Sequence, residues 1–229
     1  MARTRLIIFA VLFIDLLLLG LGSFYFQDQY LILSFVFVIS ALVPFLVRFE
    51  ARKMEGREVV LIAILAAIAA VSRIPFAPIP SVQPTSFIIM MTAYVFGAET
   101  GFMVGALAAL VSNMFLGQGP WTPWQMLAWG MIGFSTGMLK DTWLMKKMIG
   151  KILFGFLWGF LFGWMMNVTF IFSFLDDFSW SILLTTYMAS VLFDFMHAIS
   201  NVVFLLLFST AWIKILERFK RKYGLLSMR

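Results

Sequence analysis

The chain of 229 residues contains no cysteine and one histidine, His197, and only 12% of its residues are charged. Without cysteine it can form neither a disulfide framework nor a thiolate metal site or nucleophile. With a single histidine, most ligand sets that hold a transition metal are excluded too, so we expect no metal site. The scarcity of charge, beside 62% hydrophobic residues, leaves too little polar surface to coat a water-soluble globule. The composition therefore indicates a membrane protein.

Further absences argue against an enzyme. No glycine-rich loop ending in Lys-Ser or Lys-Thr occurs, so the chain lacks the loop with which many ATPases hold phosphate. Asp15 and Asp194 lack the glycine context of paired membrane-protease aspartates, and no glycine-flanked serine motif accompanies His197. We therefore expect a binding or transport protein with no catalytic residues and no covalently bound cofactor.

Long apolar runs alternate with short gaps along the whole chain. A helix of about 20 residues crosses the hydrocarbon core of a bilayer. By this length we predict an all-α, polytopic membrane bundle of eight spans, at residues 5–26, 30–48, 58–73, 84–98, 101–116, 122–139, 152–173 and 180–213. The gap at residues 97–101 is short enough to make a tight helical hairpin. The last run exceeds one perpendicular crossing, so either residues 180–186 lie at the outer face or the helix tilts strongly.

The basic residues set the predicted orientation. Of the 17 Lys and Arg residues, only Arg73 falls on one side of the predicted spans, and all others fall on the opposite side. Basic residues near span ends are retained on the cytoplasmic side. We therefore predict a multi-pass protein of the cell membrane with both termini in the cytoplasm. The formal net charge of +6 is explained by anionic lipid headgroups, and we expect no nucleic-acid partner.

The chain divides by composition near residue 57. We predict a two-helix membrane appendage with a charged linker at residues 1–56, a six-helix substrate-binding core at 57–213 and a basic cytoplasmic tail at 214–229. Small residues recur at helical spacing in the core, which lets membrane helices approach closely. For the glycine series we favour ordinary bundle packing. The first core helix is smooth over almost its whole surface, and we expect it to dock against a partner subunit through Ala63, Ala66, Ala67 and Ala70.

Two outer segments combine aromatic and uncharged polar residues. The loop at residues 72–84 holds four prolines, which favour extended, non-helical backbone and suit a stiff lid. The second segment, residues 112–125, ends one helix, turns at its glycines and begins the next helix. Its tryptophans could form an ordinary interfacial belt, but amides beside flat aromatic faces also suit a small-molecule pocket, which we favour. The predicted pocket residues are Arg73, Gln83, Asn113, Gln118, Trp121, Thr122, Trp124 and Gln125.

A polar stripe runs along the last span. Intervals of three and four residues place on one helical face Tyr187, Ser190, Asp194, His197 and Asn201. An ionisable residue within a span is a functional candidate by default. The alternative is that Asp194 and His197 satisfy each other in the bundle interior, and for His197 both readings stay open. Function is favoured for Tyr187 and Ser190, which lie nearer the outer side, and Asn167 could face the same interior.

Residues 57–213 resemble a substrate-binding S component of an energy-coupling factor (ECF) transporter. The resemblance rests on the six core helices, the proline-rich first outer loop, the alanine pairs Ala63-Ala67 and Ala66-Ala70, Gly105-Ala106-Leu107, Ser112-Asn113 and Gly117-Gln118-Gly119-Pro120-Trp121-Thr122-Pro123-Trp124-Gln125. It implies a subunit that captures a vitamin under its outer loops and docks on a membrane T protein through the alanine face. Two cytoplasmic ATPases would then drive uptake. The two helices of residues 1–56 depart from the six-helix pattern.

The substrate is the least determined part of this resemblance. The segment Trp121-Thr122-Pro123-Trp124 looks most similar to S components for cobalamin or related corrinoids, so we expect cobalamin or another corrinoid, with other vitamins and precursors open. The alternative of another class is a non-transporting membrane scaffold or assembly protein. A binding protein must gain stability with its ligand by mass action, whereas a scaffold need not.

Overall fold

The structure, a computed structural model, describes residues 55–172 and 179–224 and scattered helical positions between Ile32 and Val47. All regular elements in this part are helical, which confirms the predicted all-α class. The first predicted span lies outside the described residues. The elements are α3 (Gly56–Val71), the 3-10 turn η2 (Ile74–Phe76), α4 (Thr85–Phe96), α5 (Ala98–Leu116), α6 (Trp121–Leu139), α7 (Trp143–Lys146), α8 (Met148–Phe172) and α9 (Trp180–Tyr223).

The core helices follow the predicted order. Four of the described helices are long and apolar enough to cross a membrane, at Gly56–Phe76, Ala98–Leu116, Met148–Ile171 and Trp180–Tyr223. Helix α4 is a shorter apolar helix, and α6 coincides with the predicted span at residues 122–139. Between α4 and α5 stands Gly97 alone, at a φ of 101° that favours glycine. The predicted tight hairpin is thereby confirmed.

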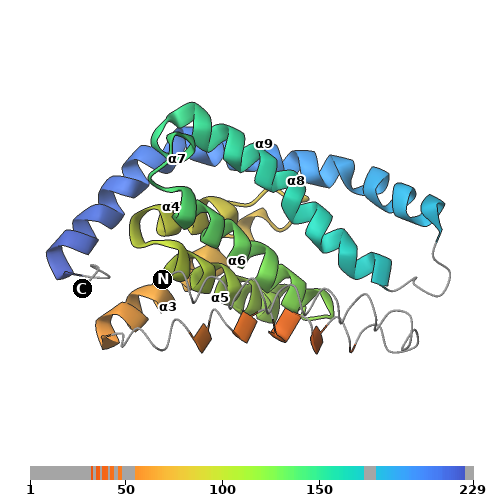
Figure 1. Cartoon of the computed structure of the whole chain (residues 1–229), viewed down its shortest axis with the longest axis horizontal. Helices are drawn as coiled ribbons and strands as arrows, with labels where there is room; N and C mark the ends of the chain where they lie inside the picture. Colours follow the sequence, from red (N-terminus) through yellow and green to blue (C-terminus); the bar gives the residue numbers. More distant parts are fainter. Residues whose placement is uncertain are drawn as a thin grey trace.

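Helix α9 is continuous over 44 residues. At 1.5 Å per residue it is about 66 Å long, roughly twice the thickness of a hydrocarbon core. It runs past Ile213 through the basic segment and ends at Gly224, whose φ of 58° is the left-handed conformation of a helix C-cap. In Figure 1, α8 and α9 lie together along one flank of the molecule, over α4 and α6.

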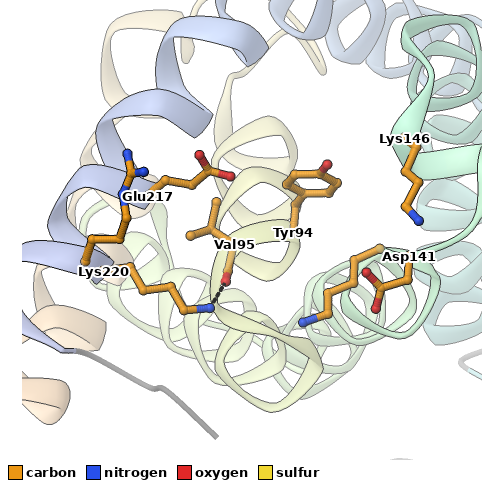
Figure 2. A pocket seen from close by; sticks show the side chains of 8 residues that line it. Tyr94, Val95, Asp141, Lys146, Glu217 and Lys220 are labelled. Atoms are coloured by element: carbon orange, nitrogen blue, oxygen red, sulfur yellow. Dashed lines mark hydrogen bonds between the residues drawn. The ribbon is translucent and has the colours of Figure 1, made fainter.

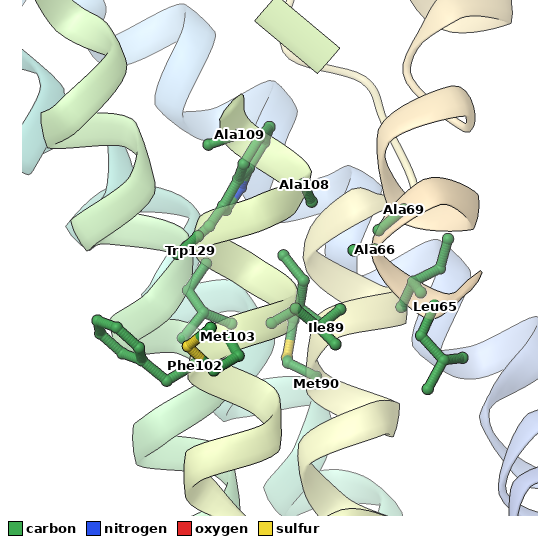
Figure 3. Packing of buried hydrophobic residues seen from close by; sticks show 14 of the residues in the cluster. Leu65, Ala66, Ala69, Ile89, Met90, Phe102, Met103, Ala108, Ala109 and Trp129 are labelled. Atoms are coloured by element: carbon green, nitrogen blue, oxygen red, sulfur yellow. The ribbon is translucent and has the colours of Figure 1, made fainter. Parts of the chain in front are cut away.

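Helix α4 is the centre of the bundle, because α3, α5, α6 and α9 all pack against it. Figure 3 shows Ile89 and Met90 between Leu65 of α3 on one side and Phe102 and Trp129 on the other. These five side chains are all buried. Burying apolar side chains against one another from four directions fixes α4 in place, so the ends of α4 are rigid reference points for both faces of the protein.

The glycine series pack helices together, as predicted. A β-carbon on Gly133 of α6 would collide with the backbone of Gly101 in α5, and one on Gly159 of α8 would collide with the backbone of Ala198 in α9. Both helix pairs therefore approach to backbone contact, the arrangement that small residues permit in membranes. The second of these crossings sets the geometry of the site described below.

The alanine face of α3 is only partly exposed. Ala66 and Ala70 are buried against the chain's own helices, at 3% and 1% exposure, whereas Ala63 and Ala67 are exposed. The expectation that all four form one docking surface is corrected, because two of them already pack inside the subunit. The exposed face continues through large apolar side chains, among them Val60 and Ile64.

Candidate functional site

The loop at residues 72–84, predicted to be the first outer loop, is fastened to the bundle at both ends. The prediction of an entirely non-helical loop is wrong at its start, where Ile74–Phe76 form a 3-10 turn whose early proline presets the backbone. At the far end, the Ser200 hydroxyl of α9 accepts a hydrogen bond from the Gln83 backbone N–H (3.0 Å) and donates to the Gln83 carbonyl (3.1 Å). The loop is thus held against α9 as well as between α3 and α4.

Arg73 connects this loop to α5 and α6. Its Nε donates to Gln83 Oε1 at 2.9 Å, and its Nη1 donates to Ser112 Oγ at 2.6 Å and to Asn113 Oδ1 at 2.9 Å. The guanidinium also stands over the ring of Trp129, 4.8 Å from the ring centroid. Hydrogen bonds from a charged group are stronger than neutral ones, and the aromatic face adds a cation–π attraction. One side chain therefore joins three elements.

The hydrogen bonds continue from Asn113 into α6. Asn113 Nδ2 donates to Thr122 Oγ1 at 3.1 Å and to Gln125 Oε1 at 2.7 Å, and the Thr122 hydroxyl donates to Gln118 Oε1 at 2.9 Å. Most of the polar residues predicted for the pocket are therefore brought together, but they bind one another. We call this network the outer clamp, consisting of Arg73, Gln83, Ser112, Asn113, Gln118, Thr122 and Gln125.

The tryptophans of this region differ in exposure. Trp124 is buried at 5% exposure, whereas Trp121 is 43% exposed beside Gly119 at the start of α6. Trp121 therefore has the position of an interfacial-belt residue. Sequence reasoning missed Trp129, which is fully buried under Arg73 and stacks on Phe162 of α8 with ring centroids 5.4 Å apart. Its position one helical turn after Gln125 was the available signal.

A cavity of about 290 Å³ lies between α8 and α9, beside the outer clamp. Three residues of the predicted stripe line it, together with Asn167 and with apolar side chains of both helices. The lining residues are Ser81, Phe162, Gly163, Met166, Asn167, Ser190, Phe193, Asp194 and His197. Tyr187 lies apart from them, and its hydroxyl contacts the Trp164 carbonyl at 3.5 Å. We refer to this space as the α8–α9 cavity.

The polar groups of the cavity form a short relay. Asn167 Nδ2 donates to Ser190 Oγ at 2.7 Å, and the Ser190 hydroxyl is 3.0 Å from Asp194 Oδ2. His197 Nε2 is paired instead with the Ser86 hydroxyl of α4, at 2.8 Å. The alternative that Asp194 and His197 satisfy each other is therefore wrong. Within the described residues no three His, Asp or Glu side chains gather as metal ligands.

Small and aromatic residues of α8 shape the cavity around these groups. The Asp194 carboxylate occupies the space that a β-carbon on Gly163 would fill. Phe162 meets the His197 ring edge to face, with centroids 4.8 Å apart, and its other neighbour is Trp129. Arg73, Trp129, Phe162 and His197 thus form a continuous row from the outer clamp to the cavity wall. Through this row, the pocket residues predicted in the two outer segments lie next to the polar stripe of α9. The two groups do not form one site.

The comparisons with known proteins agree with this architecture. The family model described as "ECF-type riboflavin transporter, S component" matches residues 53–218. A UPF0397 protein of Vibrio atlanticus (strain LGP32) is 30% identical over 89 residues, which is 37% of this chain and 48% of that protein. A UPF0397 protein of Aliivibrio fischeri (strain MJ11) is 29% identical over 90 residues, 37% of this chain and 49% of its own. The chain therefore spans about half the length of these curated relatives. No solved structure matches.

Proposed function

The chain belongs to the ECF-type riboflavin transporter S component family, and we propose that it captures a flat heteroaromatic vitamin of about flavin size in the α8–α9 cavity. S components are membrane subunits that bind substrate for uptake and catalyse no reaction. The observation that carries the proposal is the pairing of an acidic polar relay with aromatic and thioether walls in one cavity beside the outer loop.

The size of the cavity favours a flavin-sized ligand over a corrinoid. Pockets for small organic ligands occupy about 300–1,000 Å³, and 290 Å³ lies at the lower limit of that range. A corrinoid is several times larger than a flavin and would require the loop and α9 to separate. The segment that suggested cobalamin, at residues 121–124, is not part of the lining of this cavity. Thr122 belongs instead to the outer clamp, and Trp124 is buried.

The chemistry of the lining favours a ligand that donates hydrogen bonds. The described contacts of the Asp194 carboxylate include one hydrogen bond, from Ser190, and a carboxylate can accept several. An N–H group at the edge of a heteroaromatic ring would complete its shell. Phe162, Phe193 and Met166 supply apolar surface for the ring faces. Preorganised polar groups beside apolar walls fix both the position and the orientation of a planar ligand.

Ligand binding to the full chain in detergent, measured by thermal shift and by titration, tests this proposal. The panel contains riboflavin, other heteroaromatic vitamins, cobalamin and cobinamide. We expect riboflavin or a compound of similar size to stabilise the protein, since a ligand that binds the folded state raises its stability by mass action. Asp194→Asn should weaken that binding about tenfold, because one charged hydrogen bond is replaced by a neutral one. Asp141→Asn, the same chemical change remote from the cavity, is the matched control.

The outcomes separate the candidate functions. If corrinoids alone stabilise the protein, its substrate is a corrinoid and not a flavin-sized vitamin. If riboflavin stabilises the protein but Asp194→Asn and Asp141→Asn weaken its binding equally, the binding site is not the α8–α9 cavity. A protein that no vitamin stabilises would support a scaffold or assembly role.

We further propose that the exposed face of α3 docks on a membrane T protein, which cooperates with two cytoplasmic ATPases. Ala63 and Ala67 leave a shallow surface between exposed Val60 and Ile64, into which another helix can pack closely. Ala67→Leu should therefore lower transport in membranes without changing vitamin affinity of the isolated chain. Ala211→Leu, at an exposed alanine of α9, is the control. Normal transport with Ala67→Leu would exclude this face as the docking surface.

A further inference from the structure

A second cavity, of about 430 Å³, lies at the opposite end of α4 from the outer loop. Its lining comes from α4, the segment between α6 and α8, and the extension of α9. Figure 2 shows Tyr94 at the end of α4, with Glu217 and Lys220 of α9 on one side and Asp141 and Lys146 on the other. The positive-inside pattern predicts that this end faces the cytoplasm. We call this space the basic cleft.

Basic side chains dominate the cleft. It is lined by four of them, Lys140, Lys146, Lys220 and Arg221, against the two carboxylates of Asp141 and Glu217. Within the described residues, Lys140, Lys146 and Arg221 form no ion pair with these carboxylates, and the ion pair found there joins Arg57 to Glu55. Like charges that converge on one space repel one another, so an anion between them would lower their electrostatic energy.

A hydrogen bond joins two of the elements that line the cleft. Lys220 Nζ donates to the Val95 carbonyl at 2.7 Å, near the end of α4, and stands over the ring of Phe96. This contact ties the extension of α9 to the most buried helix of the bundle. The remaining basic side chains, on Lys140, Lys146 and Arg221, therefore approach the cleft from two separate and fixed supports.

We propose that the basic cleft binds a phosphate group at the cytoplasmic surface of the membrane, carried by an anionic phospholipid headgroup. Lysine and arginine are the side chains that proteins use for phosphate, and basic residues near a membrane surface attract anionic lipids. Exposed aromatic residues of the kind found at membrane interfaces support a headgroup depth for the cleft: Trp143 on α7 is 57% exposed and Tyr223 on α9 is 42% exposed. The two carboxylates limit the excess positive charge, which suits one phosphate group rather than a polyanion.

The test uses the full chain in detergent with added lipid. Thermal stability is measured with phosphatidylglycerol, with phosphatidylcholine at the same concentration, and with inorganic phosphate or glycerol 3-phosphate. We expect phosphatidylglycerol to raise the unfolding temperature and phosphatidylcholine to leave it unchanged. Stabilisation by the soluble phosphates at similar concentration would retain the phosphate site and assign it to a soluble ester instead of a lipid.

Charge variants locate the site. Lys146→Gln and Arg221→Gln should each weaken the phosphatidylglycerol effect about fivefold in apparent affinity, the usual contribution of one basic residue near a membrane surface. Glu217→Gln should strengthen it, because a like charge is removed. Arg218→Gln, an exposed neighbour outside the cleft, is the matched control.

If Arg218→Gln weakens the phosphatidylglycerol effect as much as Arg221→Gln does, the lipid is attracted to the basic surface in general. That result would overturn the proposal. So would a phosphatidylglycerol effect that persists in the Lys146→Gln, Arg221→Gln double variant. Vitamin binding is measured in the same samples and is expected to be unchanged, so failure here is distinguishable from failure of the substrate proposal.

Discussion

The outer clamp and the α8–α9 cavity lie side by side and have similar polar content, yet their hydrogen bonds are arranged differently. In the clamp, Arg73 and Asn113 each engage several partners from the loop, α5 and α6. In the cavity, the relay from Asn167 ends at the Asp194 carboxylate beside open space. From this difference we predict that the clamp stabilises the fold and that the cavity is available to a ligand.

The difference has an energetic consequence. Polar groups that satisfy one another have little left to offer a ligand, whereas removing one of them leaves the others buried and unpaired. A group that lines a cavity can exchange its solvent for a ligand at small cost to the folded protein. Clamp variants should therefore lose stability, and cavity variants should lose affinity.

The largest effect is expected from Arg73→Ala. The change leaves Gln83, Ser112 and Asn113 without their shared charged donor, which we expect to cost about 3 kcal/mol in the free energy of unfolding. Chemical denaturation of the ligand-free chain in a mild detergent measures it. Arg73→Lys keeps the charge but cannot reproduce the fork of donors, so it should recover only part of the loss. A normally stable Arg73→Ala protein with lost vitamin binding would reverse the roles of the two regions.

Two glycine variants test the same distinction between stability and ligand affinity, and we expect effects of intermediate size. Gly133→Ala forces a β-carbon against the Gly101 backbone, which cannot yield easily, and should destabilise the protein by about 1–3 kcal/mol. Gly163→Ala meets the Asp194 carboxylate instead, and a side chain can rotate away. We expect this variant to remain folded and to bind the vitamin more weakly.

Unfolding midpoints and titrations on both glycine variants check the pair. Equal destabilisation, with no change in affinity for Gly163→Ala, would show that Asp194 is a packing residue and does not contact ligand.

The sequence alone predicted the parts of the fold that follow from a run of apolar residues or from helical periodicity. The apolar runs located the core helices, and the interval pattern placed Ser190, Asp194 and His197 on one face of α9. What it could not supply was the partner of each polar group. His197 binds Ser86, 111 residues away, and Gly163 makes room for Asp194 across a helix crossing. Such pairings depend on tertiary packing, which no local spacing encodes.

The same limit explains the tryptophans. Both Trp121 and Trp124 stand in one polar-aromatic segment, and the sequence offered the same two readings for both. Their positions along α6 separate them, because Trp121 is the first residue of the helix, whereas Trp124 lies one turn further in, among the buried residues of the helix. Trp124 consequently enters the core and Trp121 remains at the surface.

The smallest effect is expected from Trp121→Ala. Its ring is 43% exposed and rests beside Gly119, so its loss should change the free energy of unfolding in detergent by about 0.5 kcal/mol or less. Vitamin affinity should also stay within error, because Trp121 belongs to neither the clamp nor the cavity lining. Trp124→Ala, which empties a buried position on the same helix, should lower stability by about 3–5 kcal/mol. If Trp121→Ala instead abolished vitamin binding, the bound ligand would have to extend from the α8–α9 cavity to Trp121 at the start of α6. A corrinoid is large enough to do that, so this one variant also separates the two substrate readings.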